Sequence, residues 1–510
     1  MEKSRITVRL QGHEYYYPVS DILRLFTGSI PKEEECAVVC DAGALAPLIV
    51  DDISPEKALV LVSSVSDDFV ETFAAGEDGN GCDDAAAKGE RILMKRSELT
   101  LPLNREVKRQ LYFLLSKITG KAFPWGSLTG IRPTQVAREL ASEEEMTSVY
   151  GVREDKAHLA FLTQKKEDDV LSTSSPDALH IYIGIPFCPS RCSYCSFISQ
   201  EAPKKTELLP SYVDAVLHEM DQVLPKIGDK IETLYIGGGT PTVLPEVLFE
   251  KFIRGVFSHP ELSSLKEVCV EAGRPDTITE KKLQVLQQCG VRRICINPQT
   301  LCDSTLARVG RRHSAEDFVR AYELAKKMGF SIINTDLIAG LPGESSEEFC
   351  DSLRRIIGLS PENITVHSLS KKRRSSLRRE EIVRSEEEEL KRIESMLSFA
   401  SSSLLGAGYF PYYMYKQKDT LGGHENVGYS REGTECLYNV AMMSDLRSVL
   451  SFGAGGMSKR VFINESSCEG SGNGASNVRV ERCSCIKDPI QYMQNVDAMA
   501  EKKIRFFTEK

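Results

Sequence analysis

The pattern of hydrophobic and polar positions is most regular from Leu179 onward. There, short apolar runs rich in β-branched residues alternate with stretches in which apolar residues recur every three or four positions. The first pattern predicts buried strands, and the second predicts amphipathic helices. The predicted strands begin at His180, Glu232, Glu267, Arg292, Ile332 and Ile364. The predicted helices between them cover residues 212–224, 246–257, 280–288, 315–328 and 346–357.

Strands and helices that alternate at this spacing predict an α/β fold, in which parallel strands are joined by right-handed crossovers. We assign residues 173–370 to this central domain. Because the chemistry of such folds lies at the C-terminal ends of the strands, we expect the functional residues just after each predicted strand.

The N-terminal region, residues 1–172, carries shorter signals of both kinds and predicts an α/β accessory domain. Strands are predicted at residues 5–10, 37–50 and 58–65, and helices at residues 17–26 and 106–118. A stretch rich in Gly, Asp and Ala at residues 76–89 predicts a mobile insertion.

The C-terminal region, residues 371–510, predicts an α-rich extension that serves as a lid or substrate region. Residues 371–394 are dense in Arg, Lys and Glu, which is typical of a solvated helix with charge pairs. A last helix is predicted at residues 489–503, and residues 464–477 predict a low-complexity loop.

Composition and charge argue against several classes of partner and location for this protein. The formal net charge of −9 argues against nucleic acid or an anionic membrane surface as a partner, and no apolar run is long enough to span a bilayer. The first ten residues contain no apolar signal segment, so we do not expect secretion. The 15 cysteines are irregularly spaced, which favours reduced thiols in a cytoplasmic protein.

Three of these cysteines carry the clearest chemical signal. Cys188, Cys192 and Cys195 form a C-x3-C-x2-C motif directly after an apolar run. Thiolates are soft ligands that suit iron, and three of them would leave one iron of a four-iron cluster open for catalysis. The alternatives are a zinc knuckle, which would need a second cysteine pair, and three unrelated buried cysteines. Other cysteines, such as Cys269 and Cys295, are expected to be small buried hydrophobic residues.

The motif and its surroundings resemble a known family. Tyr194 directly precedes the last cysteine, and Ile185-Pro186-Phe187 directly precedes the first. Residues 179–459 are similar to the radical S-adenosylmethionine (SAM) superfamily, in its oxygen-independent coproporphyrinogen III oxidase branch, and most of all to HemZ-type coproporphyrinogen dehydrogenases. The resemblance implies a partial (β/α)6 TIM-like barrel that holds a [4Fe–4S] cluster on the three cysteines and SAM on the open iron.

The same resemblance implies a set of cofactor-binding residues. The glycine-rich stretch after the strand Leu234-Tyr235-Ile236 matches a SAM-binding loop, and glycines there would let the backbone approach a ligand. An Asp in the apolar strand around residue 336 would be costly to bury without a partner, which favours a functional role independently. The implied positions are Tyr182, Tyr194, Gly238 and Glu271 for the first SAM, and Gly239, Thr240, Gln299, Arg311 and Asp336 for a second SAM or the substrate.

The implied reaction is the radical oxidative decarboxylation of two coproporphyrinogen III propionates to vinyl groups, which gives protoporphyrinogen IX. It implies a tetrapyrrole substrate, an electron donor of the flavodoxin or ferredoxin type and an unidentified electron acceptor. The propionates would need cationic partners. The candidates are Arg311, Lys371, Lys372, Arg373, Lys416 and Lys459.

Departures from the family leave an alternative open. The oxidase has a fourth cysteine where this chain has Phe197, and a histidine where it has Gly184, which puts the second SAM in doubt. Haem-binding chaperones of the same superfamily lack that fourth cysteine and carry an H-N-x-x-Y-W motif. Here His424 is shifted by one position, and Ser430 replaces the tryptophan. A haem chaperone is therefore the alternative function.

Overall fold

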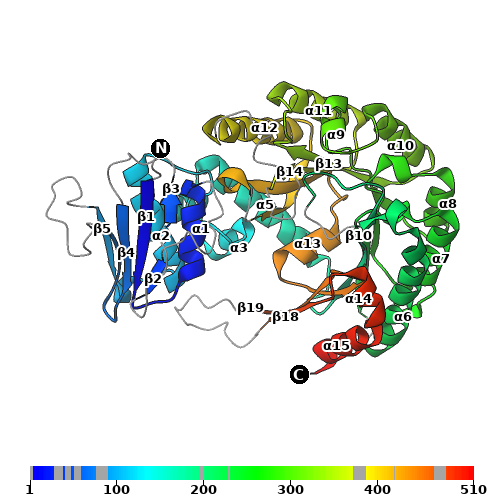
Figure 1. Ribbon diagram of the computed structural model, residues 1–510, viewed down its shortest axis with the longest axis horizontal. Coiled ribbons are helices and arrows are strands. Elements are labelled where there is room, and N and C mark those ends of the chain that lie inside the picture. The colour runs from blue at the N-terminus through cyan, green and yellow to red at the C-terminus, as the bar shows by residue number, and fades with distance from the viewer. Residues whose placement is uncertain are drawn as a thin grey trace. The chain divides into compact units, whose positions relative to one another are not determined.

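The computed structural model describes residues 4–27, 38–40, 48–50, 59–75, 90–195, 200–227, 230–370, 386–417, 420–463 and 478–509. These residues form two compact units (Figure 1). The first comprises the described residues up to Phe161 together with 416–424, and the second comprises the remaining described residues. The predicted insertion at 76–89 and the predicted loop at 464–477 lie outside the described residues, as does the charged stretch up to residue 385.

The first unit is a sheet with helices packed on it. Its strands are β1 (Ser4–Gln11), β2 (Val38–Cys40), β3 (Leu48–Val50), β4 (Leu59–Val65), β5 (Phe69–Ala75) and β6 (Arg91–Lys95), in the order β2-β1-β4-β5-β6 with β3 beside β1. Its helices are α1 (Tyr16–Thr27), α2 (Leu103–Thr119), α3 (Pro133–Glu139) and α4 (Glu143–Tyr150), followed by α5 (Glu154–Ser172), which continues into the second unit. The helix predicted at 106–118 is confirmed as α2.

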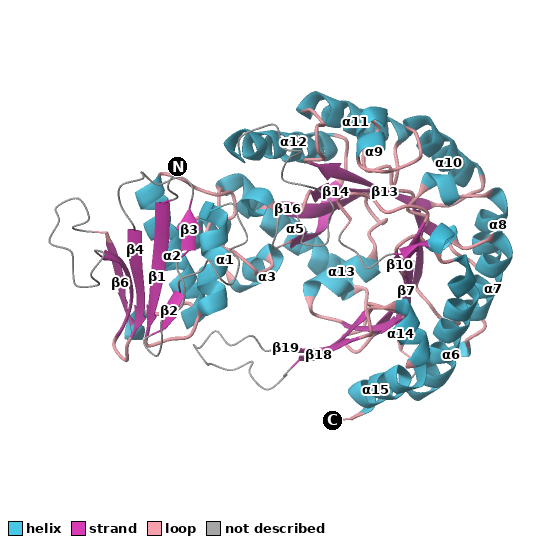
Figure 2. Ribbon diagram, in the orientation of Figure 1, coloured by secondary structure: helices cyan, strands magenta, loops and turns pink. Residues whose placement is uncertain are grey.

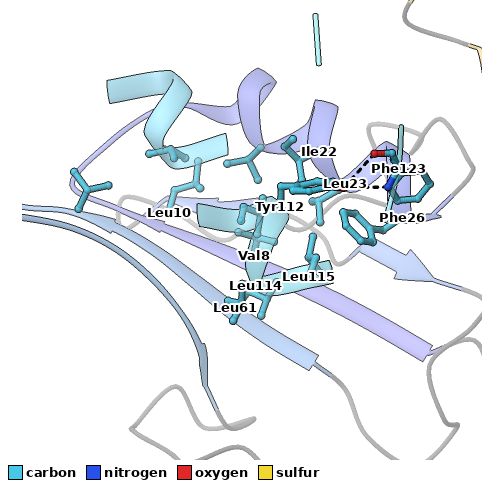
Figure 3. Close-up of a cluster of buried hydrophobic side chains, with 14 residues drawn as sticks. Val8, Leu10, Ile22, Leu23, Phe26, Leu61, Tyr112, Leu114, Leu115 and Phe123 are labelled. Carbon is cyan, nitrogen blue, oxygen red and sulfur yellow. Dashed lines mark hydrogen bonds between the residues drawn. The ribbon is translucent and has the colours of Figure 1, made fainter. Parts of the chain in front are cut away.

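The core of the first unit lies between the sheet and helices α1 and α2 (Figure 3). Alternate residues of β1, Val8 and Leu10, meet Ile22 and Leu23 of α1 there, and all four are fully buried or nearly so. Leu111 of α2 is fully buried in the same cluster. The apolar faces that the sequence pattern predicted for these elements therefore face one another.

The second unit contains an 11-stranded sheet in the order β15-β16-β14-β13-β12-β11-β10-β7-β17-β18-β19. Its central strands are β7 (Leu179–Ile185), β10 (Ile231–Gly238), β11 (Glu267–Glu271), β12 (Arg293–Cys295), β13 (Ile332–Ala339) and β14 (Asn363–Ser368). All five pairings among them are parallel. Each begins within one residue of its predicted start, so the predicted parallel sheet is confirmed. No pairing among the described strands joins β15 to β19, which leaves the barrel partial.

Helices follow the central strands and cover the outer side of the curved sheet (Figure 2). They are α6 (Leu209–Ile227), α7 (Glu246–Phe257), α8 (Glu280–Gln288), α9 (Asp303–Arg308), α10 (Ala315–Lys327) and α11 (Ser346–Leu359). The N-termini of α10 and α11 are fixed by local sequence, because Ser314 and Ser345 each form a capping box with the acidic residue three positions later. Within the described residues, no helix is long and apolar enough to cross a membrane.

The C-terminal region adds both helices and strands. The helices are α12 (Glu386–Gly406), α13 (Leu437–Ser444), α14 (Pro489–Gln494) and α15 (Val496–Thr508). The strands β15 (Phe410–Lys416), β16 (Glu425–Ser430), β17 (Ser448–Phe452), β18 (Met457–Ile463) and β19 (Val478–Ser484) extend the sheet at both ends and were not predicted. The single helix predicted at 489–503 is two helices, because the backbone leaves the helical region at Asn495.

Candidate functional site

One face of the central strands gathers polar side chains at the C-terminal edge of the sheet. Alternate residues of a strand share a face, and the observed register brings Gly237, Glu271, Asn297, Asp336 and His367 to the same face near that edge. The sequence predicted functional residues at the strand ends. The structure places this polar cluster there.

The three motif cysteines follow β7 on one short loop. Cys188 ends β8 (Phe187–Cys188), and its Sγ accepts a hydrogen bond of 3.5 Å from Thr240 Oγ1. Cys192 is buried, and its carbonyl oxygen accepts from the amide of Cys195 at 3.1 Å. None of the three forms a disulfide. Residues 196–199, where the oxidase has its fourth cysteine, lie outside the described residues.

The three cysteines are not arranged as ligands of a single metal ion. Within the part of the chain that the structure describes, no three Cys, His, Asp or Glu side chains are grouped as ligands of a single metal ion. A four-iron cluster makes a different demand, since each of its irons takes its own thiolate. Three thiols on one short loop therefore suit a cluster better than they suit a zinc ion, which needs four ligands around one centre.

One segment far along the chain, residues 309–311, holds the cysteine loop. Ser190 Oγ donates to the carbonyl oxygen of Gly310 at 3.1 Å, and the Ser193 amide donates to Val309 at 3.0 Å. Arg311 Nη1 donates to the Tyr194 hydroxyl at 3.1 Å. The loop is therefore fastened to the segment that follows α9, and Tyr194 faces Arg311.

The glycine-rich loop after β10 packs directly against the cysteine strand. The Gly239 amide donates to Ile185 O, and the Thr240 amide donates to Phe187 O, both at 2.8 Å. A Cβ at Gly239 would lie 2.5 Å from the Phe187 carbonyl oxygen, so only glycine fits there. Gly238 has a φ of +107°, and a Cβ on it would lie 3.1 Å from the Tyr182 hydroxyl. These backbone positions therefore bring the loop close to both β7 and the first cysteine.

Glu271 is a half-buried carboxylate whose hydrogen-bond partners are neutral. It accepts hydrogen bonds from the Tyr235 hydroxyl at 2.7 Å and from the Gly238 amide at 3.2 Å. The pKa of Glu271 is raised to about 7, first by burial and then by the neighbouring Asp336, against the opposing effects of the two hydrogen bonds and of His367. A cationic ligand beside this carboxylate would relieve the cost of keeping it charged.

Asp336 has the partners that its position in an apolar strand requires. Its Oδ1 accepts from Asn334 Nδ2 at 2.7 Å, and its Oδ2 lies 3.6 Å from His367 Nε2. His367 Nδ1 in turn lies 3.2 Å from the Tyr415 hydroxyl. Asp336, His367 and Tyr415 thus form a row of side chains contributed by three strands, β13, β14 and β15.

Two amide side chains at the same edge leave polar atoms unused. Asn297 Oδ1 and Gln299 Oε1 are buried and accept no hydrogen bond from any described residue. Gln299 also has a φ of +71°, which is uncommon for a residue with a side chain. Buried polar atoms normally have partners, so a polar ligand that supplies them fits this edge of the sheet.

Of the lysines and arginines predicted to bind propionates, Lys459 and Lys416 bind other protein groups, and three lie outside the described residues. Lys459 Nζ donates to the carbonyls of Ala441 and Met442 and pairs with Asp445 at 3.2 Å. Lys416 belongs to the first unit, where it donates to Leu128 O at 2.8 Å. The stretch that holds Lys371, Lys372 and Arg373 is outside the described residues. His424 belongs to the first unit and is buried.

Sequence reasoning missed several residues that line the barrel. Tyr182 stacks with Tyr235 and Tyr438 at centroid distances of 6.2 and 6.3 Å, and the latter two rings are 4.6 Å apart. Helix α13, which carries Tyr438, donates two amides to Glu267 at the N-terminal end of β11. The period of two along β10 could have revealed Tyr235, since it shares parity with the predicted site residue Gly239, whereas β14, which carries His367, contains no predicted site residue. Cys269 and Cys295 are buried as predicted, with sulfurs 3.6 Å apart.

Comparison with known proteins finds a family and individual proteins that this chain is similar to. Residues 182–356 match the sequence model of the Radical SAM superfamily. The chain is 35% identical over 419 residues to the oxygen-independent coproporphyrinogen-III oxidase-like protein HemZ of Bacillus subtilis, which covers 78% of this chain and 79% of that protein. It is also 35% identical over 190 residues to the heme chaperone HemW of Bacillus subtilis, which covers 37% of this chain and 49% of that protein.

Among solved structures, coproporphyrinogen III oxidase (HemN) from Escherichia coli, described as a radical SAM enzyme, is similar with a TM-score of 0.48 and 20% identity. That similarity covers 67% of this chain and 73% of HemN.

Proposed function

This chain belongs to the radical SAM family of oxygen-independent coproporphyrinogen-III oxidase-like proteins, and from that premise we propose that it converts propionate groups of coproporphyrinogen III to vinyl groups. The product of two such steps is protoporphyrinogen IX. The main support is the 419-residue similarity to HemZ, which extends well beyond the barrel. Members of the radical SAM superfamily use a [4Fe–4S] cluster and SAM.

We assign the cluster to Cys188, Cys192 and Cys195. The three thiols lie on one loop, and none of them is in a disulfide, so each is available as a thiolate ligand for a separate iron. When bound, the cluster and SAM supply one-electron cleavage of the sulfonium C–S bond, which provides the means to remove a hydrogen atom from the substrate. An external electron donor of the flavodoxin or ferredoxin type and an electron acceptor would complete the reaction.

The residues at the strand ends would hold SAM. SAM carries an ammonium and a sulfonium, and Glu271 is a half-buried carboxylate that accepts hydrogen bonds from a hydroxyl and an amide. The Gly238 amide donates to Glu271, and the Tyr182 hydroxyl of β7 lies close to Gly238. We propose that Glu271 orients the cationic part of SAM next to the cysteine loop.

The remaining polar groups of this edge would face the substrate or a second SAM. Asn297 and Gln299 offer buried oxygen atoms that accept from no described residue, and Asp336 is held in place by Asn334 and His367. By contrast, the Arg311 guanidinium is 6% exposed and already donates to protein oxygens. We therefore propose that Asn297 and Gln299, rather than Arg311, meet the incoming ligand.

The decisive experiment is an anaerobic assay of the reconstituted protein with SAM, a reductant and coproporphyrinogen III. We expect 5′-deoxyadenosine together with a vinyl-bearing porphyrin, detected by mass spectrometry. Cys192→Ala should yield neither product, whereas Cys269→Ala, at a buried cysteine away from the motif, should keep both. Formation of 5′-deoxyadenosine without vinyl product would refute the substrate.

Heme chaperone activity is the second candidate, because HemW is 35% identical to this chain over 190 residues. It predicts stoichiometric haem binding and no vinyl product in the same samples. That outcome would replace the dehydrogenase with the chaperone.

A further inference from the structure

The polar face at the strand ends contains one imidazole beside two carboxylates. Glu271, Asn297, Asp336 and His367 share this face. Of these four, only His367 can carry a positive charge. Its Nε2 lies 3.6 Å from Asp336 Oδ2, and its Nδ1 lies 3.2 Å from the Tyr415 hydroxyl. The His367 side chain is 23% exposed and Tyr415 is half-buried, so this row of side chains is not sealed inside the protein.

A glycine in the intervening strand lets the tyrosines of β15 reach towards β14. Strand β16 lies between these two strands, and its Gly428 pairs with Thr365. A Cβ at Gly428 would lie 1.8 Å from Tyr413 Cε1, so only glycine leaves room for that ring, whose hydroxyl lies 3.5 Å from Thr365 Oγ1. The ring of Tyr415 stacks on that of Tyr413 at a centroid distance of 6.5 Å and an interplanar angle of 6°. The sheet therefore fixes the place at which Tyr415 meets His367.

The charge of this face limits the ligand groups that it can accept. An anionic group beside Glu271 and Asp336 is repelled unless a cation and a hydrogen-bond donor meet it. A tyrosine hydroxyl can accept one hydrogen bond while it donates another. When both ring nitrogens of His367 carry hydrogen, Nε2 faces the Asp336 carboxylate and Nδ1 donates to Tyr415. The phenol can then donate to an acceptor other than His367.

We propose that Tyr415 and His367 bind a propionate carboxylate of the tetrapyrrole, with Tyr415 as the hydrogen-bond donor and His367 as the source of positive charge. Asp336 is the positioning residue of this site, because it faces the far nitrogen of the imidazole and accepts from Asn334 at 2.7 Å. The inference rests on the proposed function, since that function supplies the carboxylate. It also explains how a carboxylate is bound although Lys459 pairs with Asp445 instead.

The hydroxyl of Tyr415 is tested by Tyr415→Phe, with Tyr413→Phe as the matched control that removes a hydroxyl from the stacked ring. Both variants are reconstituted anaerobically in the full chain, and kcat, KM for coproporphyrinogen III and SAM affinity are measured. Loss of one hydrogen bond to a charged group should raise KM about 10–100-fold in Tyr415→Phe and leave SAM affinity unchanged. Tyr413→Phe should keep the KM of wild type. An unchanged KM in Tyr415→Phe, or an equal rise in both variants, would overturn the proposal.

The charge is tested by His367→Gln, which also decides the proposal if Tyr415→Phe fails to fold. Its binding of coproporphyrin III is followed by porphyrin fluorescence and compared with its binding of the tetraamide of the same porphyrin, which has no carboxylates. We expect weaker binding of coproporphyrin III than in wild type and unchanged binding of the tetraamide, because only the former presents negative charge. Equal effects on both ligands would overturn the carboxylate assignment. A wild-type protein that forms no vinyl product from coproporphyrinogen III would instead refute the proposed function, so the two failures are distinguishable.

Discussion

Replacing Glu271 by glutamine should make the protein less sensitive to alkaline pH. Burial raises the pKa of Glu271 from 4.5 to about 7, so the folded protein holds a proton that the unfolded chain releases at lower pH. Such a group gives its full stabilisation below the unfolded pKa, and that stabilisation is lost as the pH rises through the folded pKa. Glutamine can still accept from Tyr235 or Gly238, but it carries no charge to bury.

The size of the effect follows from the two pKa values. Each unit of difference corresponds to about 1.36 kcal/mol once both states are ionised. Between pH 5 and pH 8, wild type should lose roughly 2.5 kcal/mol of its free energy of unfolding through this carboxyl alone. The difference in stability between Glu271→Gln and wild type should therefore move in favour of the variant by about 2.5 kcal/mol over that interval.

The assay is urea unfolding of both apoproteins, followed by circular dichroism at several pH values. Subtracting the free energy of unfolding of wild type from that of the variant at each pH removes the contribution of every other titrating group. Glu232→Gln is the matched control, because burial raises the pKa of Glu232 but Lys266 at 2.8 Å and local hydrogen bonds outweigh burial and lower it. The difference in the free energy of unfolding between Glu232→Gln and wild type should be constant above pH 5. A constant difference for Glu271→Gln as well would refute the reasoning.

Two further predictions concern buried contacts of the second unit. Lys503→Met removes the cation that pairs with the fully buried Glu219 at 2.5 Å, and it should lower the free energy of unfolding in urea by about 3–5 kcal/mol. Adding Glu219→Gln should recover much of that loss, because no buried charge is then left unpaired. Equal stabilities of the single and double variants would contradict this prediction. Gly238→Ala forces a Cβ to 3.1 Å from the Tyr182 hydroxyl at a φ of +107° and should abolish SAM binding in calorimetry. Gly290→Ala, which has open space at a φ of +78°, should keep it, so loss in both would show general strain instead.

Most of the central fold could be predicted from the sequence because its signals are local. Parallel strands covered by helices are buried on both faces, so they appear as short continuous apolar runs. The C-terminal strands lack that signature. Strand β16 is wholly buried although it contains Glu425 and Asn426, and β18 contains Lys459 and Arg460 among its seven residues. Their place in the sheet depends on pairings with distant strands, which periodicity cannot reveal.

The candidate site shows the same division between local and distant information. The cysteine motif is contiguous and could be found directly, and Asp336 stood out as a polar residue in an apolar strand. His367 and Asn297 gave no such signal, because their importance comes from the register of β12, β13 and β14. The contact between Arg311 and Tyr194 joins residues 117 positions apart in the chain and required the folded structure.

The two carboxylates of β11, one at each end of the strand, differ in how completely the protein neutralises their charge. Glu267 and Glu271 share one face of the strand. Glu267 accepts from two amides of α13 and pairs with Arg293 at 3.3 Å, so the protein neutralises it from within. Glu271 receives only one hydroxyl and one amide, and its burial is opposed by no contacting cation among the described residues. The protein thus neutralises the carboxylate at one end of β11 and leaves the one at the other end without a cation, which favours our proposal that the ligand binds beside Glu271. Because the cysteine loop and the glycine loop meet there too, the charge that Glu271 lacks is best supplied by a cationic ligand such as SAM.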